Sequence, residues 1–215
     1  MAHVEQMAFF QNARHYFPRY FKSTRVLEIG SLNINGTVRV FFENCDYKGL
    51  DIGPGPCVDE ICNGEDFGAP AGSYDAVLST EVFEHTENWD LIFLNMVRLM
   101  KKDGILLFSC ASYGRTQHGT QLFSAGAAPH VAASTDYYRN LIAKDFTDAF
   151  NFGHWFSDHC FVEDQNCLYF VGIGRRETAY LPTMKEFKDA YRQYLYKRHV
   201  LGLPHDYIVS GKLPK

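Results

Sequence analysis

Residues 26–37 are VLEIGSLNINGT, an apolar run followed by a glycine, a polar loop and the start of a helical pattern. Gly30 permits a tight turn and lets a ligand approach the backbone. The loop is not a P-loop, because no Gly-Lys-Ser/Thr follows, and residues 31–35 lack the further glycines of the GxGxxG dinucleotide fingerprint. Glu28 disfavours a phosphate and favours a cationic ligand. The segment therefore predicts a strand–loop–helix unit that binds a ligand without phosphate groups.

The rest of the chain alternates short apolar runs with helical patterns. Predicted strands occupy residues 25–29, 47–52, 74–79, 105–110 and 168–173, and predicted helices occupy 1–22, 37–42, 89–102, 135–144 and 183–200. Strands that are apolar throughout are covered on both faces. The alternation predicts an α/β fold with a Rossmann-like, doubly wound and mainly parallel sheet. Ligands of such sheets bind outside the carboxyl ends of the strands.

Length and composition predict one ordered domain. The 215 residues are 46% hydrophobic and 21% charged, which excludes disorder for most of the chain. The expected parts are an N-terminal helical extension (1–22), a core (24–174) and a C-terminal helix (182–200). No apolar run is long enough to span a membrane. Six scattered cysteines and a start without a secretory pattern predict reduced thiols and a cytoplasmic protein without a membrane partner.

Charge is distributed unevenly along the chain. The formal net charge is −4, but residues 175–215 carry nine basic and four acidic side chains. The preceding part is therefore strongly acidic, which argues against general nucleic-acid binding. A basic C-terminal helix could still contact an anionic partner.

Carboxylates follow two further predicted strands. Asp51 ends the second strand, 21 residues after Gly30, where a carboxylate can accept both hydroxyl groups of a ribose. Asp66 could accept from an adenine amino group, with Phe67 beside the ring. Together with Glu28, these residues predict S-adenosylmethionine, which carries adenosine and a positive charge but no phosphate. The alternatives are a Rossmann-like scaffold in which these acids are structural, or a nicotinamide oxidoreductase.

Four motifs then resemble those of class I S-adenosylmethionine-dependent methyltransferases in order and spacing. They are VLEIGSLNINGTVR, YKGLDIG, GSYDAVLSTEVFEH and LMKKDGILLFS, within residues 24–112. The resemblance implies a seven-stranded sheet whose last strand, residues 167–174, is antiparallel. The chain departs from the family's acid-x-Gly-x-Gly-x-Gly loop, because polar Ser31, Asn33 and Asn35 stand in a longer loop without the second and third glycines.

The resemblance also implies the positions of the cofactor contacts. Residues expected near the methionine part are Glu28, Gly30, Ser31, Asn33, Ser79 and Thr80, and those expected near ribose and adenine are Asp51, Ile52, Asp66 and Phe67.

Glu81, Glu84 and His85 form an ExxEH motif after the third long strand. Positions i, i+3 and i+4 share one helix face, so these side chains could bind Mg²⁺ or Mn²⁺. The motif is similar to the metal site of small-RNA 3′-end 2′-O-methyltransferases and quinone-pathway O-methyltransferases, and a metal would lower the pKa of a bound hydroxyl. The alternative is a metal-free helix start with favourable carboxylates. Candidates for a fourth ligand are His118, His130, His154 and His159.

The segment 112–134 is polar and glycine-containing, and it follows the strand whose end faces the transferred methyl group in this family. It predicts part of a substrate pocket or lid, with His118 as a general base beside His85 and residues 136–139 framing the pocket. Two aromatic patterns predict packing instead. They are the segment 151–159 and the helical stripe of Phe187, Tyr191, Tyr194 and Leu195.

The predicted function is methyl transfer to an oxygen of a small molecule or saccharide, with or without a metal ion. Two other classes stay open. One is a binding protein that keeps the cofactor fold without catalysis. The other is an RNA methyltransferase that uses the basic C-terminal helix, which the acidic body of the domain disfavours.

Overall fold

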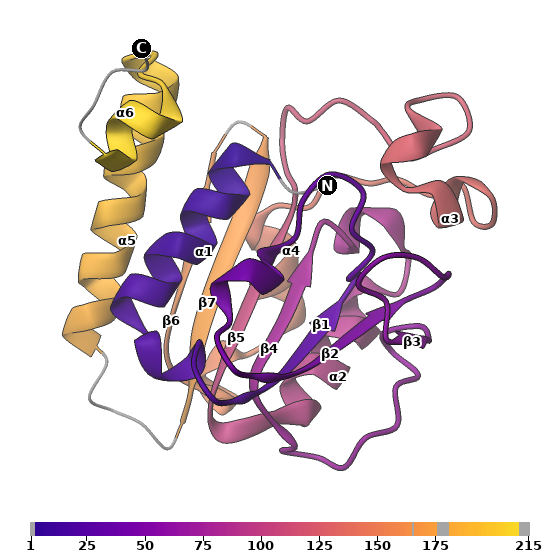
Figure 1. The fold of residues 1–215 in the computed structure, drawn as a ribbon, viewed down its shortest axis with the longest axis horizontal. Coiled ribbons are helices and arrows are strands. Elements are labelled where there is room, and N and C mark those ends of the chain that lie inside the picture. Colours follow the sequence, from indigo (N-terminus) through magenta and orange to yellow (C-terminus); the bar gives the residue numbers. More distant parts are fainter. Residues whose placement is uncertain (1–2, 165, 176–180, 211–215) are drawn as a thin grey trace.

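The protein is described by a computed structural model that covers residues 3–164, 166–175 and 181–210 (Figure 1). Its centre is a seven-stranded sheet with the order β3-β2-β1-β4-β5-β7-β6. The strands are β1 (Arg25–Ile29), β2 (Asp46–Asp51), β3 (Glu60–Ile61), β4 (Tyr74–Thr80), β5 (Met100–Ala111), β6 (Phe156–Glu163) and β7 (Cys167–Gly174). Only β7 runs antiparallel to its neighbours, β5 and β6. The predicted Rossmann-like sheet with an antiparallel last strand is confirmed.

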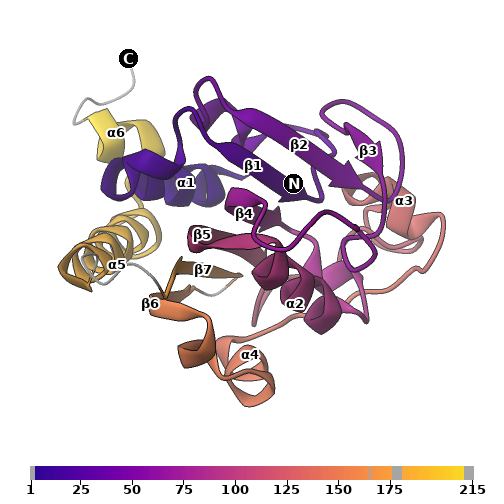
Figure 2. The same ribbon diagram turned by 90° about the horizontal axis from the view of Figure 1, so that it is seen from below.

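Helices cover both faces of the sheet (Figure 2). Helices α1 (Val4–Tyr16) and α5 (Leu181–Leu195) pack on one face, and α2 (Trp89–Leu99) and α4 (Ala143–Ala149) pack on the other. The shorter helical turns are η1 (Pro18–Tyr20), η2 (Val38–Phe41), η3 (Phe83–His85), η4 (Ala125–Ala127), α3 (Pro129–Ala132), η5 (Phe152–His154), η6 (Tyr196–Val200) and α6 (His205–Ser210). Within the described residues, no helix is both long and apolar enough to cross a membrane.

The N-terminal helix and the C-terminal helix pack against each other through aromatic side chains. Phe9 of α1 lies 5.6 Å from Phe187 and 5.3 Å from Tyr191 of α5, both with edge-to-face geometry. Such pairs add to the free energy gained by burying the rings. The predicted packing role of the α5 stripe is therefore confirmed, and α1 ends just before Pro18, which begins the turn η1.

Three differences between the predicted and the observed elements have a clear structural reason. Helix α2 ends at Leu99, before its predicted end at residue 102, and strand β5 begins at Met100, before its predicted start at residue 105. The predicted helix over 135–144 is wrong, because Asp136 has a φ of +51° and the next helix begins only at Ala143. Strand β6 occupies part of the segment predicted as an aromatic corner. Its polar Asp158 and His159 hide the strand pattern, because β6 is an edge strand.

Candidate functional site

The loop after β1 folds back on the end of β2. Gly30 takes a φ of +81°, and the backbone N–H groups of Gly30 and Ser31 both donate to the carbonyl of Leu50, at 2.8 and 2.9 Å. The next N–H, of Leu32, donates to Asp51 Oδ2 at 3.1 Å. The turn that glycine permits therefore brings Asp51 beside the loop, as the spacing predicted.

Glu28 is buried at the same edge. Tyr47 donates to Glu28 Oε2 at 2.8 Å, and the Thr80 hydroxyl donates to Oε1 at 3.4 Å. Burial raises the pKa of Glu28 to about 7, against the opposing effect of the Tyr47 hydrogen bond. Tyr47 was not among the predicted site residues, although its place in the neighbouring strand puts it within reach of Glu28.

A narrow polar cavity opens between these elements. It is lined by Glu28, Gly30, Ser31, Leu32, Gly36, Thr37, Val38, Thr80 and Gln6. Gln6 belongs to α1, and its amide donates to Ser109 Oγ at the end of β5, at 2.8 Å. The N-terminal extension therefore forms one wall of the cavity, which the sequence analysis did not predict.

The other predicted cofactor residues have mixed placements. The side chain of Asn33 accepts from the N–H of Gly36 within the loop, and Ile52 is 41% exposed beyond β2. The hydroxyl of Ser79 is fully buried and has no hydrogen-bond partner among the described residues. Asp66 is exposed and accepts from Asn63.

Phe67 differs most from its expected place beside adenine. The ring is only 8% exposed and packs in the core, 6.5 Å from Tyr74. Its carbonyl accepts from Asn95 and Arg98 of α2, which holds the backbone against that helix. Because those hydrogen bonds turn the segment inward, Phe67 supports the fold rather than presenting a face to a ligand.

His130 covers the loop after β2. A Cβ atom added at Gly53 would lie 2.4 Å from the His130 ring, and His130 Nε2 lies 3.1 Å from the carbonyl of Pro54. The segment that follows β5 thus crosses to the end of β2 through α3. The role of residues 112–134 as a lid stays a prediction.

Glu84, His85 and His118 form a second cluster, on the side of β5. Their metal-binding atoms lie within 4.8 Å of one another, and the rings of His85 and His118 are 5.1 Å apart. The N–H of Ala111 donates to Glu84 Oε1 at 3.1 Å. Glu84 Oε2 and His85 Nδ1 are buried without a hydrogen-bond partner among the described residues. This cluster can accept protons or hold a cation.

Burial controls the protonation of this cluster. Burial and the nearby Glu81 raise the pKa of Glu84 above its usual value. Burial lowers the pKa of His85 to about 4 and also lowers that of His118. Both imidazoles are therefore neutral at pH 7, which is the form that accepts a proton or binds a metal.

The predicted metal site requires Glu81 beside Glu84 and His85, but the structure separates Glu81 from them. It has a φ of +57°, and its carboxylate turns toward α1, accepting from the Ser109 hydroxyl at 2.9 Å. His118, one of the suggested fourth ligands, lies beside Glu84 and His85 instead. The other suggested ligands are elsewhere: His130 packs on Gly53, His154 is exposed in η5, and His159 stacks on Phe152.

Comparison with known proteins agrees with this architecture. A family model described as a methyltransferase domain matches residues 42–108. No curated protein sequence matches the chain.

Similar solved structures include methyltransferases of low sequence identity. The 1,6-didemethyltoxoflavin-N1-methyltransferase of Burkholderia thailandensis, with bound S-adenosylhomocysteine, is 12% identical, with a TM-score of 0.53 and 78% of each chain covered. Phosphoethanolamine N-methyltransferase 2 of Haemonchus contortus is 16% identical, with a TM-score of 0.51. The match covers 95% of this chain but 47% of that longer one. At these identities the likeness shows the fold.

Proposed function

We propose that this chain is a class I, S-adenosylmethionine-dependent methyltransferase and that it methylates a hydroxyl oxygen of a small molecule or saccharide. The sulfonium of the cofactor would supply the electrophilic methyl group. The protein would contribute binding, orientation and exclusion of water. The observation that carries the proposal is the convergence of Glu28, Thr80 and Asp51 around the turn at Gly30.

These residues match the chemistry of the cofactor. Glu28 lines a polar cavity and offers a carboxylate to the ammonium group of the methionine part. Asp51 ends β2 and can accept the ribose hydroxyl groups. His130 would then cover the adenosine from the lid, since it already packs on Gly53.

The acceptor would lie at the Glu84–His85–His118 cluster. As the acceptor oxygen attacks the methyl carbon, the carbon–sulfur bond breaks and the hydroxyl proton must leave. His118 is half-buried and neutral, so it can take this proton as a general base. If Mg²⁺ or Mn²⁺ assists, its ligands would be Glu84, His85 and His118, because Glu81 points toward α1.

A small acceptor is favoured over RNA by the position of the basic helix. Figure 1 shows α5 and α3 at opposite sides of the molecule. Arg198, in the basic segment, is also engaged, since its Nε lies 3.2 Å from Glu5 Oε1. A cytoplasmic location is part of the proposal, because all six cysteines are free thiols.

The test is a turnover assay. The protein is incubated with S-adenosylmethionine and panels of sugars, phenols, amines and RNA, with Mn²⁺ or with a chelator, and S-adenosylhomocysteine release and product structure are measured. An O-methylated product supports the proposal, and an exclusively N-methylated product would overturn the oxygen assignment. Cofactor binding without turnover on any acceptor would favour the non-catalytic alternative.

A further inference from the structure

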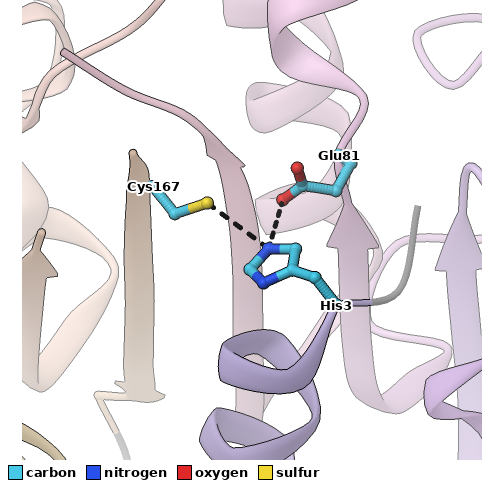
Figure 3. A group of neighbouring side chains, drawn as sticks. All are labelled: His3, Glu81 and Cys167. Carbon is cyan, nitrogen blue, oxygen red and sulfur yellow. Dashed lines mark hydrogen bonds and ion pairs between the residues drawn. The ribbon is translucent and has the colours of Figure 1, made fainter. Parts of the chain in front are cut away.

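Three side chains with metal-binding atoms meet where α1 begins (Figure 3). His3 precedes α1, Glu81 follows β4 and Cys167 begins β7. His3 Nε2 lies 3.3 Å from Cys167 Sγ and 3.8 Å from Glu81 Oε1. We propose that His3, Glu81 and Cys167 bind one divalent transition-metal ion of the zinc type. This inference does not depend on the proposed methyl transfer.

The spacing fits a tetrahedral ion without large movements. Zinc binds imidazole nitrogen, carboxylate oxygen and thiolate sulfur at about 2.0–2.3 Å, which places neighbouring ligand atoms about 3.4–3.6 Å apart. The two separations from His3 Nε2, 3.3 and 3.8 Å, bracket that range, and all three ligand atoms lie within 4.8 Å of one another. A thiolate with an imidazole selects zinc or a similar ion over Mg²⁺, which prefers oxygen ligands. Three protein ligands leave one position for water.

The surroundings of His3 present the correct nitrogen. His3 Nδ1 lies 3.2 Å from Glu5 Oε2, so an N–H at Nδ1 can donate to that carboxylate. The lone pair of Nε2 then faces Cys167 and Glu81, as in the carboxylate–histidine–metal arrangement common in proteins. Nδ1 also lies 3.3 Å from the N–H of Gln6, which it can cap only in the other tautomer. Metal binding at Nε2 would favour the tautomer in which the N–H at Nδ1 donates to Glu5.

The charges also balance around a divalent ion. The side chains of Glu81 and Cys167 are buried, and Glu81 Oε2 has no hydrogen-bond partner in the described part of the chain. The carboxylate of Glu81 and a thiolate at Cys167 would together match the charge of a divalent ion, while Arg198 pairs with the carboxylate of Glu5. Arg115 is a further nearby cation, with its guanidinium nitrogens 3.9 Å from Glu81 Oε2 and 3.8 Å from Cys167 Sγ.

Without metal, His3 and Cys167 carry the protons that a metal ion would replace. An N–H at His3 Nε2 can donate to Cys167 Sγ at 3.3 Å, and Glu81 Oε1 lies 3.8 Å from the same nitrogen. Metal binding would displace the proton on Nε2 and convert the thiol to a thiolate. Two protons would leave as the metal–nitrogen and metal–sulfur bonds form.

The ion would also support the cofactor cavity. Glu81 accepts from Ser109, which accepts from Gln6, and Gln6 lines the cavity. A metal at Glu81 would fix the start of α1 across β4 and β7. We therefore expect a structural ion that stabilises one wall of the cavity from outside it.

The experiment titrates the metal-stripped full chain with Zn²⁺ and with Co²⁺ by calorimetry and absorption. We expect one equivalent to bind, with proton release that depends on buffer ionisation and a thiolate-to-cobalt charge-transfer band. Cys167→Ser and His3→Ala should each weaken binding by roughly 100-fold or more and remove the band. The matched controls, Cys160→Ser in β6 and His15→Ala in α1, should bind as the parent does.

Three results would overturn the site. The first is the absence of stoichiometric binding, and the second is equal affinity in the Cys167→Ser and Cys160→Ser variants. The third is binding that survives Cys167→Ser but is lost with Glu84→Gln, which would assign the ion to the acceptor cluster. Should Cys167→Ser fail to fold, Glu81→Gln keeps the side-chain shape and is expected to lose affinity in the same way.

Discussion

The proposed cofactor side of the sheet contains the buried carboxylate of Glu28, and the proposed acceptor side contains that of Glu84. The two carboxylates differ in their hydrogen bonds. Both oxygens of Glu28 accept hydrogen bonds, from Tyr47 and from Thr80. Glu84 accepts one hydrogen bond from the backbone of Ala111, and its second oxygen has no partner among the described residues. An unsatisfied buried polar atom costs about 1–3 kcal/mol, so a ligand could complete the carboxylate of Glu84, whereas the carboxylate of Glu28 is already satisfied by the protein.

The two sides also differ in the origin of their residues. Glu28 and Asp51 lie at the ends of adjacent strands, and a short loop brings them together. The acceptor side instead combines the η3 turn with the distant segment that carries His118 and Tyr138, whose rings lie 5.0 Å apart. We therefore expect substitutions on the two sides to separate cofactor affinity from turnover.

The largest expected effect is on turnover. His118→Ala should lower kcat/KM by roughly 10²–10⁴-fold, because a general base is lost, and should leave S-adenosylhomocysteine affinity unchanged. The measurement uses an acceptor found in the turnover assay and compares His154→Ala, an exposed histidine of η5. An equal loss of kcat/KM in both variants, or a parallel loss of cofactor affinity in His118→Ala, would contradict separate roles for the two sides.

A pH dependence should appear on the cofactor side. Because the pKa of Glu28 is raised to about 7, its carboxylate ionises between pH 6 and 8. Affinity for the cofactor ammonium should then rise by about tenfold over that interval. Calorimetric titration with S-adenosylhomocysteine at both pH values checks this, and Glu28→Gln should show no such rise. A flat profile in the parent would remove Glu28 from the ammonium site.

Glu28 should also make the stability of the ligand-free protein depend on pH, in the opposite direction to cofactor affinity. Glu28 has a folded-state pKa above its unfolded value, so the folded state binds more protons between about pH 4.5 and 7. Its contribution to stability is present below that window and is lost as the pH rises through it, by at most about 1.4 kcal/mol per pH unit. The free energy of unfolding, measured in urea at several pH values, should fall by this slope in the parent but not in Glu28→Gln.

A smaller effect is expected from Tyr47→Phe. Removing the hydroxyl leaves Glu28 Oε2 without its donor, which disfavours the carboxylate. The pH at which cofactor affinity rises should move upward, and unfolding free energy should fall by about 1 kcal/mol. Tyr74→Phe is the control, since the ring of that tyrosine lies beside Phe67, and both oxygens of Glu28 accept from other side chains. An unchanged pH midpoint would show that Tyr47 does not act on Glu28.

The smallest effect on ligand binding is expected at Phe67. Phe67→Leu should cost about 1 kcal/mol of unfolding free energy, because the ring packs in the core. It should leave S-adenosylhomocysteine affinity within about twofold. A large loss of affinity without a loss of stability would restore Phe67 to the adenine contact that the motif suggested.

Local patterns were sufficient for the cofactor side. The apolar run before Gly30 and the spacing to Asp51 predicted a turn and a carboxylate that the structure brings together. The roles of these residues toward the cofactor stay predictions. Tyr47 and Gln6 were missed, and His130 was expected only as a metal ligand, because their contacts depend on strand register and on segments far apart in the sequence.

The acceptor side was predicted less well for the same reason. The ExxEH motif suggested that Glu81 shares a face with Glu84 and His85, as helical spacing requires. The chain is not helical at Glu81, whose positive φ sends its side chain toward His3. His3 occurs 78 residues earlier in the chain, and no periodic pattern links the two positions.

The central claim is that the end of β2 binds the ribose of an S-adenosyl cofactor. Calorimetric titration with S-adenosylhomocysteine of the parent, Asp51→Ala and Asp46→Ala tests it most directly, because Asp46 lies at the opposite end of the same strand. We predict that the parent and Asp46→Ala bind alike and that Asp51→Ala binds roughly 100-fold more weakly or not at all. A folded parent that does not bind, or an Asp51→Ala variant that binds as tightly, would contradict the claim.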